Sequence, residues 1–389
     1  MGCRVRGGKL LTLMSTGTTC ETRLKHLAGV RSVVIKLGTQ LLSDSSGRLD
    51  VDFISKIATQ VAGLWARGVR VSIVSSGAIG AGLRELNLSK RPTDLAKLQA
   101  TAAVGQRRLM DVWAGAFAAH AMPVGQILLT REDIDQRQRF LNLRNTIGAL
   151  HEMGAVPIIN ENDTVSTDEI VKITFGDNDL LAAGVTHALH ADLLVLLSVV
   201  DGVLDEAGNS VRLVENLDEA QQLVRTEKSQ LGKGGMNSKF AAARQVTEAG
   251  CALVVANGRE ESVLTNLLAG QEVGTMFLPA LRKRSSWARW IGSVRPEGTI
   301  IVDDGAARAV SEKNRSLLPA GVVKVEGTFE PGAVVAVARE DGHVVARGLT
   351  NYSSADVLRI AGRKTADVRG LLGDAAYDEV VHRDNLIAG

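Results

Sequence analysis

Short runs of β-branched and other apolar residues recur through the first two thirds of this chain and alternate with longer stretches of helical periodicity. The runs are "SVVIK" (32–36), "RVSIVSS" (70–76), "VGQILLT" (124–130), "AVPIIN" (155–160), "DLLVLLS" (192–198) and "CALVVAN" (251–257). Strands that are apolar on both faces and alternate with helices are typical of a parallel sheet covered on each side. We therefore predict an α/β fold with a mostly parallel sheet sandwiched by helices.

The pattern changes near residue 298, where short strands such as "PGAVVAVARE" and "GHVVARGLTN" are separated by Gly, Pro and Asp. This pattern predicts a small β-rich second domain. A chain of 389 residues is also longer than one core usually holds. The expected organisation is a disordered tail at 1–28, an α/β domain at 29–281, a basic linker at 282–297, the β-rich domain at 298–375 and a C-terminal tail at 376–389.

The composition excludes several classes of protein. A net charge of +2 and an aromatic content of 3% give little attraction to nucleic acid and few stacking platforms. The three cysteines form no CxxC pair, so no zinc site is predicted, and their scarcity fits a reducing, cytoplasmic location. The longest apolar runs fall short of the roughly 18 residues that span a bilayer. The predicted class is a cytoplasmic globular protein without a membrane segment.

Polar and small residues follow four of the predicted strands at the points where the strands end. Lys36 ends the first run, "GAIGAG" follows the second, "ENDTVS" follows "AVPIIN", and "VVDG" follows "DLLVLLS". Ligands of parallel α/β sheets bind beyond the carboxyl ends of the strands. We therefore expect one site at one edge of the sheet. A lysine directly after a buried strand favours a functional role over a solvated one.

Two glycine-rich stretches are candidates for binding an anion. "SSGAIGAG" (75–82) and "GKGGMNSK" (232–239) each precede or open a helical run, where backbone N–H groups bind phosphate. The second stretch does not fit the Walker pattern and follows no strand, so a P-loop fold is disfavoured. Both stretches could instead be tight turns without a ligand.

Two clusters combine carboxylates with amides, "NEND" (160–163) and "GDND" (176–179). Such residues are common as helix N-caps. Two such clusters at one sheet edge would also suit a zwitterionic or metal-bound ligand, with one Asp orienting lysines or Mg²⁺ and another group holding an amine.

With these motifs in view, the sequence resembles the amino acid kinase family, and in particular its members that phosphorylate glutamate. The matching stretches include "VVIKLGT", "SSGAIGAG", "AAVGQ", "LLTREDI", "PIINENDTVS", "FGDND", "GKGGMNSK" and "VVHRDNL", and they cover about residues 29–389. The second domain is similar to PUA domains. The resemblance implies transfer of phosphate from ATP to the γ-carboxylate of L-glutamate, giving L-glutamyl 5-phosphate, the first step of proline biosynthesis.

The resemblance also implies roles for individual residues. Lys36, Lys239 and Asp179 would be catalytic, with Asp179 organising the two lysines. The expected glutamate-binding residues are Ser76, Gly77, Asp163 and Asn178. The expected ATP-binding residues are Lys36, Gly38, Ser198, Val199, Lys233, Gly234, Gly235, Met236, Asn237, Ser238 and Lys239, with Mg²⁺ on the ATP phosphates and no metal held by the protein alone. Feedback inhibition by L-proline and a homo-oligomer are further implications.

The chain departs from the family pattern at Val199, where an Asp is usual, and this contact is lost or moved to Asp201. The sequence leaves two other functions open. The chain could phosphorylate a different small acid, or it could bind RNA through the PUA-like domain. Because a carboxylate nucleophile is ionised at neutral pH, the predicted reaction requires no general base.

Overall fold

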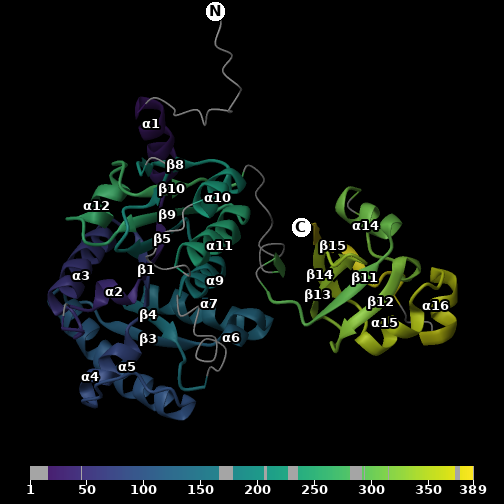
Figure 1. Cartoon of the computed structure of the whole chain (residues 1–389), viewed down its shortest axis with the longest axis horizontal. Helices are drawn as coiled ribbons and strands as arrows, with labels where there is room; N and C mark the ends of the chain where they lie inside the picture. Colours follow the sequence, from purple (N-terminus) through teal and green to yellow (C-terminus); the bar gives the residue numbers. More distant parts are fainter. Residues whose placement is uncertain are drawn as a thin grey trace, which may run out of the picture.

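The computed structural model describes residues 16–44, 46–165, 178–205, 208–226, 235–280, 291–292, 294–313, 315–372 and 377–388. The described residues form two bodies (Figure 1). The larger body contains a sheet of eight strands and the smaller body a sheet of five. This arrangement confirms the predicted α/β fold with a smaller β-rich domain.

The elements of the larger body follow one another as the hydrophobic pattern predicts. They are α1 (Thr16–Leu27), β1 (Ser32–Leu37), α2 (Thr39–Leu42), α3 (Val51–Ala66), β2 (Arg70–Ser75), α4 (Ala78–Glu85), α5 (Leu95–Ala118), β3 (Val124–Leu129), α6 (Arg131–Asp135), α7 (Arg137–Glu152), β4 (Val156–Glu161), α9 (Asp179–Leu189), β5 (Leu193–Ser198), β6 (Val203–Leu204), β7 (Ser210–Val211), β8 (Leu213–Val214), α10 (Leu217–Thr226), α11 (Gly235–Glu248), β9 (Ala252–Asn257), α12 (Val263–Leu268) and β10 (Thr275–Phe277). Each of the six predicted strands is present.

The large sheet has the order β3-β4-β2-β1-β5-β9-β10-β8. The neighbours from β3 to β9 pair in parallel, and β10 pairs antiparallel with β9. The carboxyl ends of β1, β2, β4, β5 and β9 therefore lie at the same edge. This edge is where the sequence places its polar motifs.

Helices cover both faces of this sheet, and β1 shows how the sequence assigns each face. Val33, Ile35 and Leu37 pack in the core that contains α3, α5 and α12. Val34 packs in the opposite core, with α7, α9 and α11. Because side chains alternate along a strand, Lys36 points to the same face as Val34, toward α9 and α11. The alternation of "SVVIK" thus aims the lysine at the helices that carry the other site residues.

The expectation of a disordered tail at 1–28 is wrong for residues 16–27, which form α1; residues 1–15 lie outside the described part of the chain. The Arg23 side chain is fully buried and donates to the carbonyl oxygens of Arg212 at 2.8 Å and Gly274 at 3.4 Å. Burial lowers the pKa of Arg23 to about 10, so it remains charged at neutral pH. These bonds fix α1 to the end of the sheet near β8 and β10. Arg23 is one of several scattered basic residues in this segment, and nothing in the sequence indicates that it makes a tertiary contact.

The smaller body consists of β11 (Gly298–Val302), α14 (Asp304–Ser311), η1 (Pro319–Gly321), β12 (Val322–Gly327), β13 (Val334–Arg339), β14 (Val344–Thr350), α15 (Ser354–Ile360), α16 (Thr365–Leu372) and β15 (Val381–Ala388). Its sheet has the order β12-β11-β13-β14-β15. The prediction of a C-terminal tail at 376–389 needs correction, because β15 pairs antiparallel with β14 and buries Val381 and Leu386. The charges of "HRDN" concealed this strand in the sequence.

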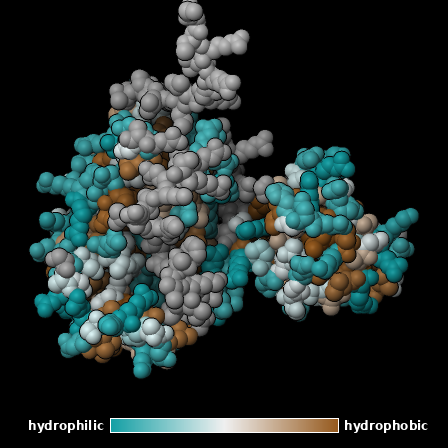
Figure 2. All heavy atoms as spheres, viewed as in Figure 1, coloured by the Kyte–Doolittle hydropathy of each residue, from teal (hydrophilic) through white to brown (hydrophobic). Residues whose placement is uncertain are grey.

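The segment between the two bodies contacts the second sheet. Arg347 donates to the carbonyl oxygen of Gly292 at 3.1 Å, and Val294 is buried in a cluster that includes Val334 and Leu349. Residues 282–290 and 293 of the predicted linker lie outside the described residues. Figure 2 shows mostly hydrophilic residues on the visible surface of the larger body and a more apolar area on the smaller one. No described helix has the length and apolarity needed to cross a membrane.

Candidate active site

The candidate site is centred on the carboxylate of Asp179, the first residue of α9, which is completely buried. Lys36 Nζ lies 2.8 Å from one carboxylate oxygen and Lys239 Nζ lies 3.1 Å from the other. The two lysines are 1% and 6% exposed. Two cations separated by about two hundred residues in sequence therefore meet on one carboxylate, at the edge where β1 ends.

The charges of these three residues depend on one another. Burial alone would raise the pKa of Asp179, but the ammonium groups of Lys36 and Lys239 and the hydroxyl of Ser238 outweigh it and lower the pKa. The Ser238 hydroxyl donates to Asp179 at 2.9 Å. The carboxylate is therefore ionised at neutral pH and holds both ammonium groups in place. A buried ion pair of this kind is weak evidence for stability, so a functional role is the better explanation.

Lys239 and Ser238 come from the first turns of α11, which begins at Gly235. Lys239 also donates to the Gly235 carbonyl oxygen at 3.1 Å. The described part of "GKGGMNSK", including Met236 and Asn237, is thus helical rather than an open loop. Lys233 and Gly234 lie outside the described residues. A helix N-terminus beside two lysines is suited to binding phosphate.

A chain of amide hydrogen bonds extends from the lysines along the sheet edge. The Asn178 side chain donates to Asn160 Oδ1 at 2.8 Å, to the Ser75 carbonyl oxygen at 2.9 Å and to Ser76 Oγ at 3.3 Å. Asn160 Nδ2 in turn donates to Gln106 Oε1 at 2.8 Å. Because each amide has one oxygen and one NH₂, these bonds fix the orientation of all three amides.

Close helix packing places Gln106 at the end of this chain. A Cβ built on Gly105 of α5 would lie 1.8 Å from the Ala78 carbonyl oxygen, and one built on Gly82 of α4 would lie 1.9 Å from the Thr101 carbonyl oxygen. The two helices therefore cross with backbone against backbone. Gly82 of "SSGAIGAG" has a packing role, whereas Gly77 adopts a left-handed conformation at φ 99° and begins α4 beside Ser76.

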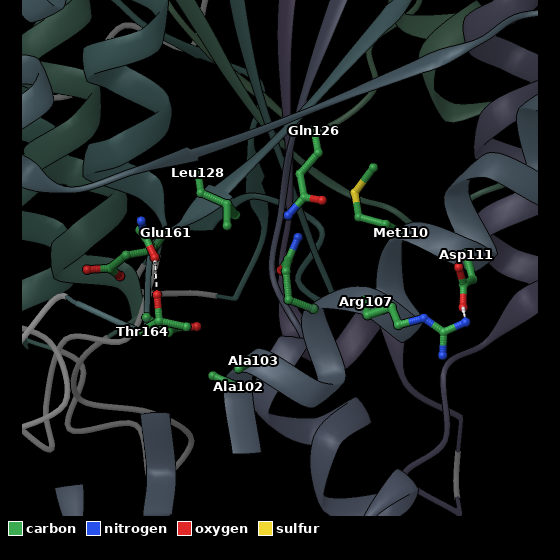
Figure 3. A pocket seen from close by; sticks show the side chains of 12 residues that line it. Ala102, Ala103, Arg107, Met110, Asp111, Gln126, Leu128, Glu161 and Thr164 are labelled. Carbon is green, nitrogen blue, oxygen red and sulfur yellow. Dashed lines mark hydrogen bonds and ion pairs between the residues drawn. The ribbon is translucent and has the colours of Figure 1, made fainter. Parts of the chain in front are cut away.

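A cavity of about 430 Å³ adjoins the amide chain (Figure 3). Figure 3 shows Ala103 and Arg107 of α5 on one side and Gln126 and Leu128 of β3 on another. Its remaining lining includes Gln106, Asn162, Asp163 and Thr164. Burial and the nearby Glu161 raise the pKa of Asp163 to about 6, although Arg91 acts in the opposite direction. The cavity thus contains a carboxylate that changes charge near pH 6.

The end of β5 carries the departure noted at Val199, whose side chain is 43% exposed. The preceding Ser198 pairs with Asn257 in the register of β5 and β9. Asn257 Nδ2 donates to Asp201 at 2.8 Å. The contact with Asn257 therefore holds Asp201 at the carboxyl end of β9, beside the end of β5. Nearby, the Gly38 N–H donates to the Leu197 carbonyl oxygen at 3.2 Å.

Two residues of the amide chain are absent from the predicted site residues, Gln106 and Asn160. Both belong to quoted motifs, "AAVGQ" and "NEND". A signal for Gln106 existed, because it is a long polar side chain on the mostly apolar buried face of α5. The contact itself depends on the crossing of α4 and α5, which spacing along the chain does not specify.

Comparison with known proteins identifies the family of this chain. The model of the amino acid kinase family matches residues 31–257, and that of the PUA domain matches residues 298–372. A glutamate 5-kinase of Pelobacter propionicus is 42% identical over 92% of this chain and 97% of its own length. A glutamate 5-kinase of Geobacter sulfurreducens is 43% identical over 93% of this chain and 98% of its own length. The solved UMP kinase of Bacillus anthracis aligns with a TM-score of 0.44 at 17% identity, covering 64% of this chain and 96% of that one, which is too distant to add to the argument.

A parallel sheet with two lysines converging on a buried carboxylate at its carboxyl edge defines the class, an α/β phosphotransferase. The chain belongs to the amino acid kinase family and carries a C-terminal PUA domain. Within that family, its relatives at 41–43% identity are glutamate 5-kinases.

Proposed function

We propose that this chain transfers the γ-phosphoryl group of ATP to the γ-carboxylate of L-glutamate, giving ADP and L-glutamyl 5-phosphate. The reaction is the first step of proline biosynthesis. The observation that carries the proposal is the pair of lysines on Asp179, directly beside the amide chain from Asn178 to Gln106. The similarity to glutamate 5-kinases over 97% or more of their length supports the same substrate.

The chemistry requires positive charge more than proton transfer. A γ-carboxylate oxygen attacks the γ-phosphorus while the bond to the β–γ bridging oxygen breaks, and ADP leaves. The nucleophile is an anion and so is the phosphate, and catalysis of such a transfer depends on positioning and cations. In this proposal Lys36 and Lys239 neutralise the transferring group, and Asp179 keeps their ammonium groups aimed at it.

ATP is proposed to enter as its Mg²⁺ complex, with the phosphates at the N-terminus of α11. The metal would be held by the phosphate oxygens and would neutralise part of their charge. Met236, Asn237 and Ser238 lie on the first turns of this helix, next to Lys239. Glutamate would occupy the other half of the site, between Ser76, Asn178 and Asp163.

The pKa of Asp163 gives a test of its role as the partner of the substrate ammonium group. We expect kcat/KM for L-glutamate to fall as the pH decreases through about 6, because the protonated carboxyl no longer attracts the ammonium group. The γ-carboxylate of glutamate titrates near 4.3 and so cannot cause this change. Initial rates between pH 5 and 8, at saturating ATP, measure the profile.

Asp163→Asn is the control for this assignment. The variant should have a lower kcat/KM for glutamate at pH 8 and should lose the inflection near pH 6, with little change in the KM for ATP. A variant that retains the inflection would show that another group causes it, and the ammonium group would then need a different partner.

The substrate itself is tested by measuring ADP release with a coupled assay across candidate acids. L-Glutamate, L-aspartate, N-acetyl-L-glutamate, carbamate and UMP are each supplied with ATP and Mg²⁺. We expect kcat/KM for L-glutamate to exceed that of every other acid by at least about 100-fold, because the site combines a carboxylate for the ammonium group with amides for carboxylates. Trapping of the acyl phosphate by hydroxylamine identifies the product. Preference for another acid would overturn the proposal.

A further inference from the structure

Gln106 has a hydrogen-bond donor that the amide chain does not use. Its Oε1 accepts from Asn160, and that bond turns Nε2 away from Asn160. Gln106 is 8% exposed, and Nε2 has no hydrogen-bond partner among the residues that the structure describes. A buried donor without an acceptor is costly, so such groups require an explanation.

The position of Gln106 in the site explains its unpaired donor. The residue lines the cavity that also contains Asp163, whereas Lys36, Lys239 and Asp179 are not part of its lining. The cavity is therefore the part of the site farther from phosphoryl transfer. If the γ-carboxylate of glutamate reacts beside the lysines, the cavity receives the other end of the molecule, which carries an ammonium group and the α-carboxylate.

These two substrate groups need different partners. The Asp163 carboxylate suits the ammonium group, while an amide N–H₂ group can donate to a carboxylate but cannot attract an ammonium group. We propose that Gln106 is a specificity-determining residue whose Nε2 donates a hydrogen bond to the α-carboxylate of the substrate. This inference rests on the proposed function. It explains why the buried donor is kept and why α5 approaches α4 so closely at the preceding residue, Gly105.

The test measures two substituted proteins on glutamate and on two analogues of it. One analogue lacks the α-carboxylate and the other lacks the amine. 4-Aminobutanoate keeps the amine and the reacting carboxylate but lacks the α-carboxylate, and glutarate keeps both carboxylates but lacks the amine. Gln106→Met has similar length and removes the donor. The measurement is kcat/KM for each acid, or the inhibition constant against glutamate where turnover is too slow.

Gln106→Met should lower kcat/KM by about 10- to 100-fold for glutamate and for glutarate, as expected when a hydrogen bond to a charged group is lost. The same variant should leave 4-aminobutanoate within about threefold of wild type, because that molecule has nothing for Gln106 to bind. Asp163→Asn should show the opposite pattern, with a loss on glutamate and none on glutarate. Partial unfolding cannot produce such patterns, since it lowers all the rates in parallel.

Gln271→Met is the matched control, because Gln271 is an exposed glutamine before β10 that does not line this cavity. It should change kcat/KM for all three acids by less than about threefold.

Equal losses of kcat/KM for glutamate and for 4-aminobutanoate in Gln106→Met would make Gln106 a positioning residue that acts through Asn160, and would overturn the proposal. A wild-type chain that does not phosphorylate glutamate would instead refute the proposed function. Glutamate turnover with unchanged acid preference in the variant would refute only the role of Gln106.

Discussion

Replacing Lys36 by methionine should lower kcat by at least about 10²–10³, the typical effect of removing one preorganised group that stabilises a transition state. Lys239→Met should have an effect of the same size. Each lysine contacts a different oxygen of Asp179, so neither can occupy the position of the other. The effect should appear in kcat more than in the KM for glutamate, because the cations act on charge that moves during phosphoryl transfer. Steady-state kinetics with ATP and L-glutamate measure it.

Methionine is chosen because it keeps most of the buried volume of a side chain that is 1% exposed at position 36. Lys56→Met, on the exposed surface of α3, is the matched control and should retain wild-type kcat. The thermal unfolding of all the variants must be compared, because each site substitution leaves Asp179 with one cation. Normal turnover by either folded variant would contradict the catalytic role of that lysine.

The fold could be predicted from the sequence because the apolar pattern within each strand indicates which of its faces are buried. The run "SVVIK" is apolar on both faces, and the structure buries it against helices on both sides. The second domain is equally visible as a change of pattern near residue 298. The two elements found where tails were expected, α1 and β15, are those whose polar residues make or tolerate tertiary contacts. Arg23 is charged and buried, and β15 contains "HRDN" within a strand.

The site could be predicted in part for the same reason. Lys36 and Asp179 stand at the ends of recognisable elements, and parallel topology brings those ends together. The role of Gln106 could not be predicted, because it depends on the distance between α4 and α5. That distance is set by Gly82 and Gly105, and the sequence of the stretch that contains Gly82 is equally consistent with phosphate binding. Amide orientation is also a property of the whole chain of hydrogen bonds and of no single residue in it.

Gly105→Ala should be among the most disruptive single-methyl changes in this chain. The new Cβ would lie 1.8 Å from the Ala78 carbonyl oxygen and 2.3 Å from the Gly82 amide nitrogen, which are backbone atoms that cannot rotate away. The helices must separate, and overpacking of this kind costs about 1–3 kcal/mol or more. Because Gln106 follows directly and α4 begins beside Ser76, kcat/KM for glutamate should also fall. Thermal unfolding and steady-state kinetics measure the two effects.

Gly115→Ala is the same substitution in the same helix and isolates the cause. Gly115 is exposed, and nothing lies within 4 Å of the position that its new methyl group would take, so the change should stabilise the protein by about 0.5–1 kcal/mol through helix propensity. Opposite signs at two positions of α5 would show that contact with α4 determines the cost at Gly105. If Gly105→Ala were as stable and as active as Gly115→Ala, α4 and α5 could not cross as closely as described. The placement of Gln106 beside Asn160 would then lose its structural basis.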